Sequence, residues 1–188
     1  MILRKETVFG VVLYIIMIFP ITAHYMEKIM VVHMLVQLPL LIFVGWLLGA
    51  AVIRKLPSFF FRWNQTGIPG MVLVVFITTY WMFPRAMDEA LSLWYVELFK
   101  FISLPLVGIL LKDSWGKIKT IGKSFVFLNY LSMFGLMGWL YVDSPIQLCN
   151  NYLEIEQQVL GGGFLLITGM MVLYIIQIAF TDRSESSE

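Results

Sequence analysis

Residues His24 to Gly49, HYMEKIMVVHMLVQLPLLIFVGWLLG, begin with a segment rich in His and Met and continue as an apolar run long enough to cross a bilayer. On a helix, Met30, His33 and Met34 share one face, and Gln37 extends the stripe. Thioether sulfur and imidazole nitrogen are the side-chain ligands that soft Cu(I) prefers. The pattern therefore indicates either a metal site or, because Met also fills gaps between helices, a packed apolar stripe.

The composition predicts an integral membrane protein. The 188 residues are 60% hydrophobic and 13% charged, with a mean hydropathy of +0.84, which lies well outside the range of soluble proteins. The lipid bilayer is thus the first expected partner, and a net charge of +1 gives no reason to expect a nucleic acid. The single cysteine, Cys149, excludes an internal disulfide, and no Cys/His spacing is typical of a zinc site.

Apolar stretches of about 20 residues predict six membrane-spanning helices. They cover residues 7–23, 29–52, 67–84, 91–111, 122–142 and 158–180. The first is interrupted near its end by Pro20. We expect an all-α bundle over residues 1–180 as a single domain, followed by a polar tail over residues 181–188.

The distribution of Lys and Arg predicts the orientation of the bundle, because cytoplasmic loops carry an excess of basic residues. With a cytoplasmic N-terminus, ten basic residues fall on the cytoplasmic side and only two, Lys28 and Arg85, on the opposite side. The ten are Arg4, Lys5, Arg54, Lys55, Arg62, Lys112, Lys117, Lys119, Lys123 and Arg183. Both termini are therefore predicted to be cytoplasmic.

With this orientation, the soft ligands collect at the outer ends of the first four spans. The candidates are His24, Met26, Met30, His33, Met34, Met82 and Met87, with Asp88, Glu89, Cys149, Glu154 and Glu156 in loops on the same side. Such a site would meet metal arriving from outside the cytoplasmic membrane. Met also occurs elsewhere in the predicted spans, for example at Met133 and Met170, so packing is the alternative.

Several residues inside the predicted spans indicate structural roles. Glu97 and Lys100 are three residues apart and can pair, which lowers the cost of charge in a membrane; a proton or metal role is the alternative. Gly45 and Gly49 form a GxxxG pattern that favours close helix packing. The run of glycines at 161–163 would allow a close backbone approach at the start of the last span.

Motifs of the common enzyme classes do not occur in the sequence. It has no GxxxxGK[ST] loop, no GxSxG turn and no HExxH helix. Internal repeats typical of transporters are also not evident. We therefore expect a binding or assembly role, not an enzyme.

Three separated stretches resemble the multi-span bacterial cytochrome c oxidase assembly factors of the CtaG type. They are Met30 to Gly45 (MVVHMLVQLPLLIFVG), Trp81 to Leu91 (WMFPRAMDEAL) and Glu156 to Ile176 (EQQVLGGGFLLITGMMVLYII). The matching residues are His33, Met34, Leu35, Pro39, Leu40, Leu41 and Gly45; Trp81, Pro84, Asp88, Ala90 and Leu91; and Gln157, Gln158, Gly161, Gly162, Gly169 and Tyr174, with Glu156 in place of an Asp.

The resemblance implies a multi-pass helical bundle in a bacterial cytoplasmic membrane that helps a respiratory copper oxidase reach its active form. Three family histidines are replaced, by Ile29, Met82 and Leu98. Met82 can preserve a soft Cu(I) ligand. The other interpretation is that this chain has lost the metal and kept the scaffold.

Two functions follow from these patterns. The first is an assembly factor that holds Cu(I) transiently at the outer face, centred on His33 and Met34, with Met30, Met26, His24 and Met82 as further candidate ligands. The second is an accessory subunit of a membrane-bound respiratory or copper oxidoreductase complex that binds no metal itself.

Overall fold

The computed structural model describes residues 5–144 and 147–185, with side chains through residue 180, and the regular structure in these residues is entirely helical. The α-helices are α1 (Lys5–Ile18), α2 (Pro20–Glu27), α3 (Met30–Val32), α4 (Leu38–Lys55), α5 (Pro57–Trp63), α6 (Ile68–Met82), α7 (Pro84–Ser92), α8 (Trp94–Ser114), α9 (Thr120–Asp143) and α10 (Glu154–Glu185). A π-helical turn, His33–Gln37, joins α3 to α4.

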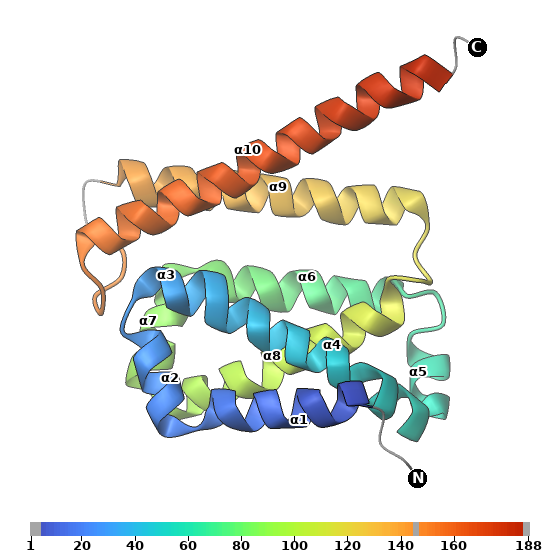
Figure 1. Cartoon of the computed structure of the whole chain (residues 1–188), viewed down its shortest axis with the longest axis horizontal. Coiled ribbons are helices and arrows are strands. Elements are labelled where there is room, and N and C mark those ends of the chain that lie inside the picture. The colour runs from blue at the N-terminus through green and yellow to red at the C-terminus, as the bar shows by residue number, and fades with distance from the viewer. Residues whose placement is uncertain (1–4, 145–146, 186–188) are drawn as a thin grey trace.

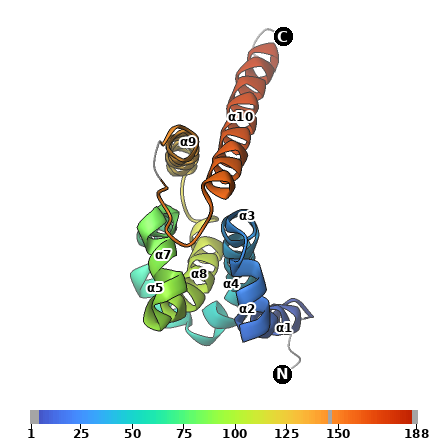
Figure 2. The same ribbon diagram turned by 90° about the vertical axis from the view of Figure 1, so that its left-hand side faces the viewer.

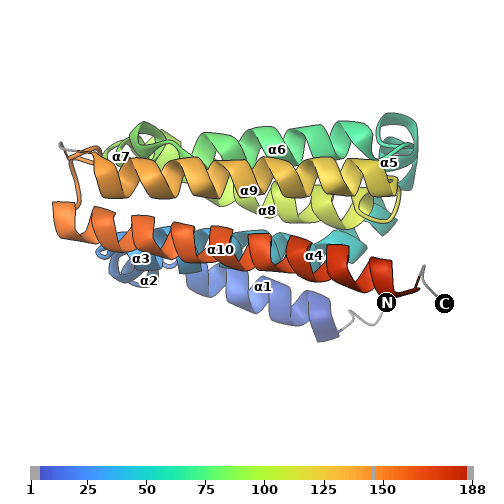
Figure 3. The same ribbon diagram turned by 90° about the horizontal axis from the view of Figure 1, so that it is seen from above.

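The helices form two layers. Helices α1 to α8 make the larger layer, with α4 and α8 packed together at its centre, while α9 and α10 form an antiparallel hairpin on one side (Figure 1). Seen from one end, the hairpin stands apart from the larger layer along most of α10 (Figure 2). From above, α9 lies over α6 and α8, and α10 lies over α3 and α4 (Figure 3).

Four helical segments are long and apolar enough to cross a membrane: 30–55, α8, α9 and residues 154–180 of α10. Two bent pairs raise the number to as many as six if each pair counts as one span. The pairs are α1 with α2, bent by 70°, and α5 with α6, bent by 90°. Of the predicted spans, the one at 7–23 is therefore not a straight helix, whereas the one at 67–84 coincides with α6, which follows the second bend. The first breaks at Pro20, as its sequence indicated, because proline lacks the N–H that a continuous helix needs.

Charge separates the two ends of the bundle. Helix α1 begins and α10 ends at the same end of the molecule (Figures 1 and 3). This end, called here the basic end, also holds α5 and the connection between α8 and α9. Its basic residues are Lys5, Arg54, Lys55, Arg62, Lys112, Lys117, Lys119 and Lys123. The opposite, acidic end holds α2, α7 and the segment 147–153, and carries Glu27, Asp88, Glu89, Glu97, Asp143, Glu154 and Glu156, against the basic residues Lys28, Arg85 and Lys100.

The central crossing of α4 and α8 depends on two glycines. A Cβ on Gly45 would lie 1.9 Å from the Pro105 carbonyl oxygen, and one on Gly108 would lie 1.9 Å from the Ile42 carbonyl oxygen. The two backbones therefore touch, which confirms the close packing predicted from the GxxxG pattern. Pro105 has no N–H for the carbonyl of Phe101 one turn earlier. The Tyr14 hydroxyl of α1 donates to that carbonyl instead, at 2.7 Å.

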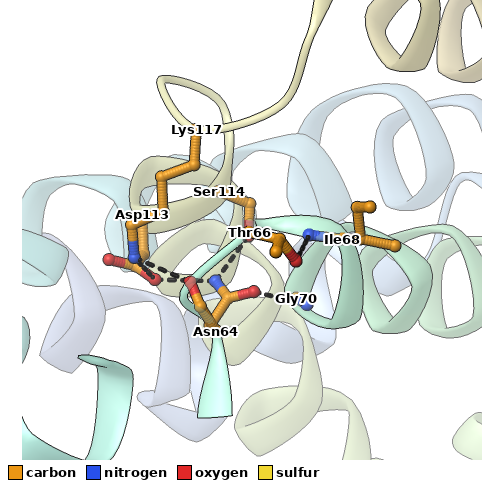
Figure 4. Close-up of polar contacts among 7 residues, drawn as sticks. All are labelled: Asn64, Thr66, Ile68, Gly70, Asp113, Ser114 and Lys117. Atoms are coloured by element: carbon orange, nitrogen blue, oxygen red, sulfur yellow. Dashed lines mark hydrogen bonds and ion pairs between the residues drawn. The ribbon is translucent and has the colours of Figure 1, made fainter. Parts of the chain in front are cut away.

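A buried polar cluster fixes the turn between α5 and α6 at the basic end (Figure 4). The Asn64 amide donates to Asp113 (2.6 Å) and Ser114 (2.9 Å), and its side-chain oxygen accepts from the Gly70 N–H (2.9 Å). Lys117 donates to the Asn64 carbonyl (3.0 Å) and to the Asp113 carboxylate (2.7 Å). Every polar group of Asn64 has a partner, so this cluster has a structural role and fixes the turn.

The polar tail predicted for residues 181–188 is helical through Glu185 as part of α10. Residues 186–188, and Arg4 of the predicted cytoplasmic set, lie outside the described residues.

Candidate functional site at the acidic end

The π-helical turn places His33 and Gln37 together inside the bundle. Its hydrogen bond from the Leu38 N–H to the His33 carbonyl spans five residues, and this wider turn keeps residues four apart near one face. It lies just before Pro39, which has no N–H to continue the ordinary pattern. Both side chains are fully buried. Such π-helical turns occur frequently at functional sites.

A chain of hydrogen bonds defines which nitrogen of His33 carries its proton. The Tyr152 hydroxyl donates to the Glu27 backbone carbonyl at 2.8 Å, and it lies 2.7 Å from His33 Nδ1. Because the tyrosine proton is already used, the Tyr152 oxygen can only accept from His33. The imidazole is therefore protonated at Nδ1, and Nε2 carries a free lone pair.

A buried ion pair lies beside this chain. Lys100 is fully buried and forms an ion pair with the Glu27 carboxylate, which also accepts from the Gln37 amide at 3.2 Å. The predicted pairing of Lys100 with Glu97 is wrong, because the ammonium points toward α2, and Glu97 lies half-buried in the first turn of α8. Opposite charges cancel within the pair, so the centre is neutral overall.

The segment 147–153 closes the site from one side. The Asp88 carboxylate of α7 accepts from the backbone N–H of Asn150 at 2.8 Å. Gln157 of α10 accepts from the Leu148 N–H at 2.8 Å and donates to the Tyr141 carbonyl at 3.4 Å. Asp88 and Gln157, two of the residues that carry the resemblance, thus hold in place the segment that supplies Tyr152.

Burial affects the titratable groups of this segment. It raises the pKa of the Tyr152 hydroxyl, so the phenol stays protonated and keeps its role in the hydrogen-bond chain. Burial, with the Asp88 charge as a smaller cause, also raises the pKa of the Cys149 thiol to about 12. Cys149 is therefore an inert, protonated thiol in the folded protein.

The predicted metal ligands are only partly brought together. Met30 and Met34 are buried in the core cluster that contains Tyr152. Met26 and Met82 are half-buried at the edge of this cluster. His24 is exposed on α2, beside Tyr25, and does not join the centre.

The other predicted structural residues have separate places. Glu156 accepts from the Leu153 N–H at 3.4 Å, near the start of α10, and Gln158 is exposed. A Cβ on Gly161 would lie 2.9 Å from the Gly138 carbonyl oxygen, which confirms a close approach of α9 and α10. Gly162 faces open space, so the expected close approach does not extend to it.

Two buried acceptors in the centre have no hydrogen-bond partner: Nε2 of His33 and Oε1 of Gln37. Buried polar atoms are normally paired, because an unpaired one costs roughly 1–3 kcal/mol. Each of these atoms has a lone pair that can accept from a hydrogen-bond donor or coordinate a cation. Across residues 5–144 and 147–180, no group of three or more His, Cys, Asp and Glu side chains is arranged to hold a metal. Of the two histidines, His33 is buried in the centre and His24 is exposed.

The sequence did not indicate Tyr152 or Glu27 as parts of this site. Tyr152 lies 119 residues from His33, and Glu27 lies 73 residues from Lys100. No local spacing connects residues this far apart. No protein-family model, curated protein or solved structure shows significant similarity to the chain.

Proposed function

We propose that this chain is a membrane-embedded copper-handling factor that holds Cu(I) transiently at His33 and serves the assembly of a respiratory copper oxidase. The observation that carries the proposal is the buried Nε2 of His33, which has a lone pair and no partner. Metal-binding histidines commonly donate their other ring N–H to a fixed acceptor, and the Tyr152 oxygen is such an acceptor.

The surroundings of His33 suit a soft, singly charged ion. Met30 and Met34 lie on the same helical segment as His33 and are buried in the adjacent core. Thioethers and imidazole suit Cu(I). The Glu27–Lys100 pair leaves the centre neutral, so nothing there offers the net negative charge that favours divalent ions. A site with few ligands also suits a protein that must release its metal, because the metal is held less tightly.

The charge distribution supports delivery at the outer face. Basic residues gather at the end opposite the site, and basic ends of membrane bundles face the cytoplasm. We place His33 accordingly near the extracytoplasmic surface of a bacterial cytoplasmic membrane. The resemblance of three stretches to CtaG-type assembly factors supports the same role.

The test is a titration of the purified protein in detergent with Cu(I) against a chromophoric Cu(I) chelator. We expect about one bound Cu(I) for the wild type and none for His33→Ala. His24→Ala is the matched control, because His24 is exposed and should leave binding unchanged. Equal copper binding by the wild type and His33→Ala, at any level, would refute the proposal.

The second candidate is an accessory subunit of a membrane-bound respiratory or copper oxidoreductase complex with no metal of its own. The observation that favours it is the ion pair between Glu27 and Lys100, which satisfies both charges within the chain. A subunit remains with its complex in mild detergent, whereas an assembly factor dissociates after maturation. Purification of the tagged chain from native membranes separates the two roles.

A further inference from the structure

A cavity of about 490 Å³ lies between the α9–α10 hairpin and the larger layer. Helices α4, α6, α8, α9 and α10 all contribute to its walls, with apolar side chains such as Ile42, Val107, Phe134 and Ile167. The hairpin stands away from the larger layer on this side (Figures 1 and 2). The volume is in the range of small-molecule sites, roughly 300–1,000 Å³.

The cavity is elongated along the bundle. Its lining runs from Met34 in the π-helical turn to Ile42 in α4, and Ile42 packs against Gly108 at the helix crossing. On α8 the lining continues past this point to Trp115, beyond the helix end. At 1.5 Å per residue, these two stretches together extend about 20 Å, against a hydrocarbon thickness of about 30 Å. The space thus matches a chain-like molecule better than a compact one.

The walls offer no free polar group to a polar ligand in this stretch. The hydroxyls of Thr78 and Tyr130 lie 2.7 Å apart and bond to each other, and Thr78 also donates to the Val74 carbonyl at 2.8 Å. Because these hydroxyls already have partners and the other lining side chains are mainly apolar, the cavity interior favours a hydrocarbon chain over a polar ligand.

Positive charge marks one mouth of the cavity. Trp115 lines the basic end, and Lys123 Nζ lies 5.4 Å from the centre of its ring. Lys119 is exposed in the same connection. Within the described part of the chain, neither lysine has an ion-pair partner, whereas neighbouring Lys117 pairs with Asp113. At the other side of the cavity, the lining residues Trp81 and Met82 are uncharged.

We propose that this cavity binds one acyl chain of an anionic phospholipid, with the lipid phosphate held by Lys119 and Lys123. Basic pockets between membrane helices on the cytoplasmic side recognise anionic lipid headgroups in this way. Trp115 lies where an aromatic side chain meets the boundary between headgroup and hydrocarbon. The lipid fills the space between the hairpin and the larger layer, and so joins them. This inference does not depend on copper binding at His33.

The test uses native mass spectrometry of the full chain in detergent, titrated with phosphatidylglycerol or with phosphatidylcholine of the same acyl chains. We expect one tightly bound phosphatidylglycerol and weaker binding of phosphatidylcholine. Lys119→Gln with Lys123→Gln should lower phosphatidylglycerol affinity by about fivefold for each lysine. The control is Lys5→Gln with Lys55→Gln, which removes two exposed charges from the same end, away from the cavity.

A second pair of variants tests the chain-binding part of the site. Ile167→Trp fills the cavity from α10, while Leu166→Trp adds the same side chain at a position that is 71% exposed. We expect Ile167→Trp to abolish retention of both lipids and Leu166→Trp to retain them. The proposal would be overturned if these two variants bound lipid equally, or if the preference for phosphatidylglycerol were unchanged after loss of both lysines. It would also be overturned if free glycerol phosphate bound as well as phosphatidylglycerol, or if the protein formed a dimer in place of binding lipid.

Discussion

The two ends of the bundle each bury a polar network, and the two networks differ in whether their members are satisfied. At the basic end, Asn64 pairs with Asp113, Ser114 and Gly70, and each of its polar groups has a partner. At the acidic end, His33 and Gln37 each keep one buried acceptor without a partner.

This difference separates a structural role from a binding role. A fully satisfied network contributes stability and a unique conformation, while a partly satisfied one costs stability unless a ligand completes it. The acidic end therefore carries the candidate site. Four substitutions test this distinction through stability and copper binding.

The largest effect is expected at the acidic-end ion pair. Glu27→Ala leaves the Lys100 ammonium buried without its carboxylate, and breaking such a pair costs about 3–5 kcal/mol. Thermal unfolding in detergent measures the loss. Glu97→Ala is the control and should cost less than about 0.5 kcal/mol, because Glu97 is not the partner of Lys100. A larger loss for Glu97→Ala would restore the local pairing that the sequence predicted.

The second largest effect is expected in the polar cluster around Asn64 at the basic end. Asn64→Ala removes three side-chain hydrogen bonds and leaves the Gly70 N–H without its acceptor, so we expect a loss of about 2–3 kcal/mol. Thr66→Ala, at an exposed position in the same turn, should cost less than about 0.5 kcal/mol. Copper binding should be unchanged in both variants, since this network has no free acceptor at Asn64.

The third effect concerns the tyrosine that fixes the His33 tautomer. Tyr152→Phe removes the bond to the Glu27 carbonyl and leaves the His33 Nδ1–H without an acceptor, at a cost of about 1–2 kcal/mol. Nitrogen NMR of the imidazole should show the Nδ1–H form in the wild type and a mixture of both forms in the variant. Tyr174→Phe, at an exposed tyrosine, should change neither quantity. An unchanged imidazole spectrum in Tyr152→Phe would contradict the hydrogen-bond chain.

Local patterns in the sequence predicted the fold class and much of the helix layout. Hydropathy predicted long helices at α8, α9 and α10, and the α4 backbone contact followed from Gly45. The 90° bend before α6 was missed. It depends on Asn64 meeting residues of α8 and on Gly67, whose φ of 75° is the left-handed conformation that glycine favours.

The candidate site was predicted less well, because its contacts join distant parts of the chain. His33, Met30 and Met34 share a short segment, so spacing alone placed them together. Tyr152 comes from a segment between α9 and α10. Lys100 pairs with Glu27 of α2 and not with Glu97, three residues away on its own helix. Whether such a pair forms depends on how the helices pack, which helical periodicity does not encode.

The smallest stability effect, and the sharpest contrast with Asn64, is expected at His33. His33→Phe loses the bond to Tyr152 but also removes an unsatisfied buried nitrogen, so the net change without metal should be below about 1 kcal/mol. With Cu(I) at one hundred times its dissociation constant, the wild type should gain about 2.7 kcal/mol and His33→Phe nothing. A metal-free loss as large as that of Asn64→Ala would mean that His33 is structural. If His33 contributes little to the stability of the metal-free protein but is required for stabilisation by Cu(I), its role is to bind the metal.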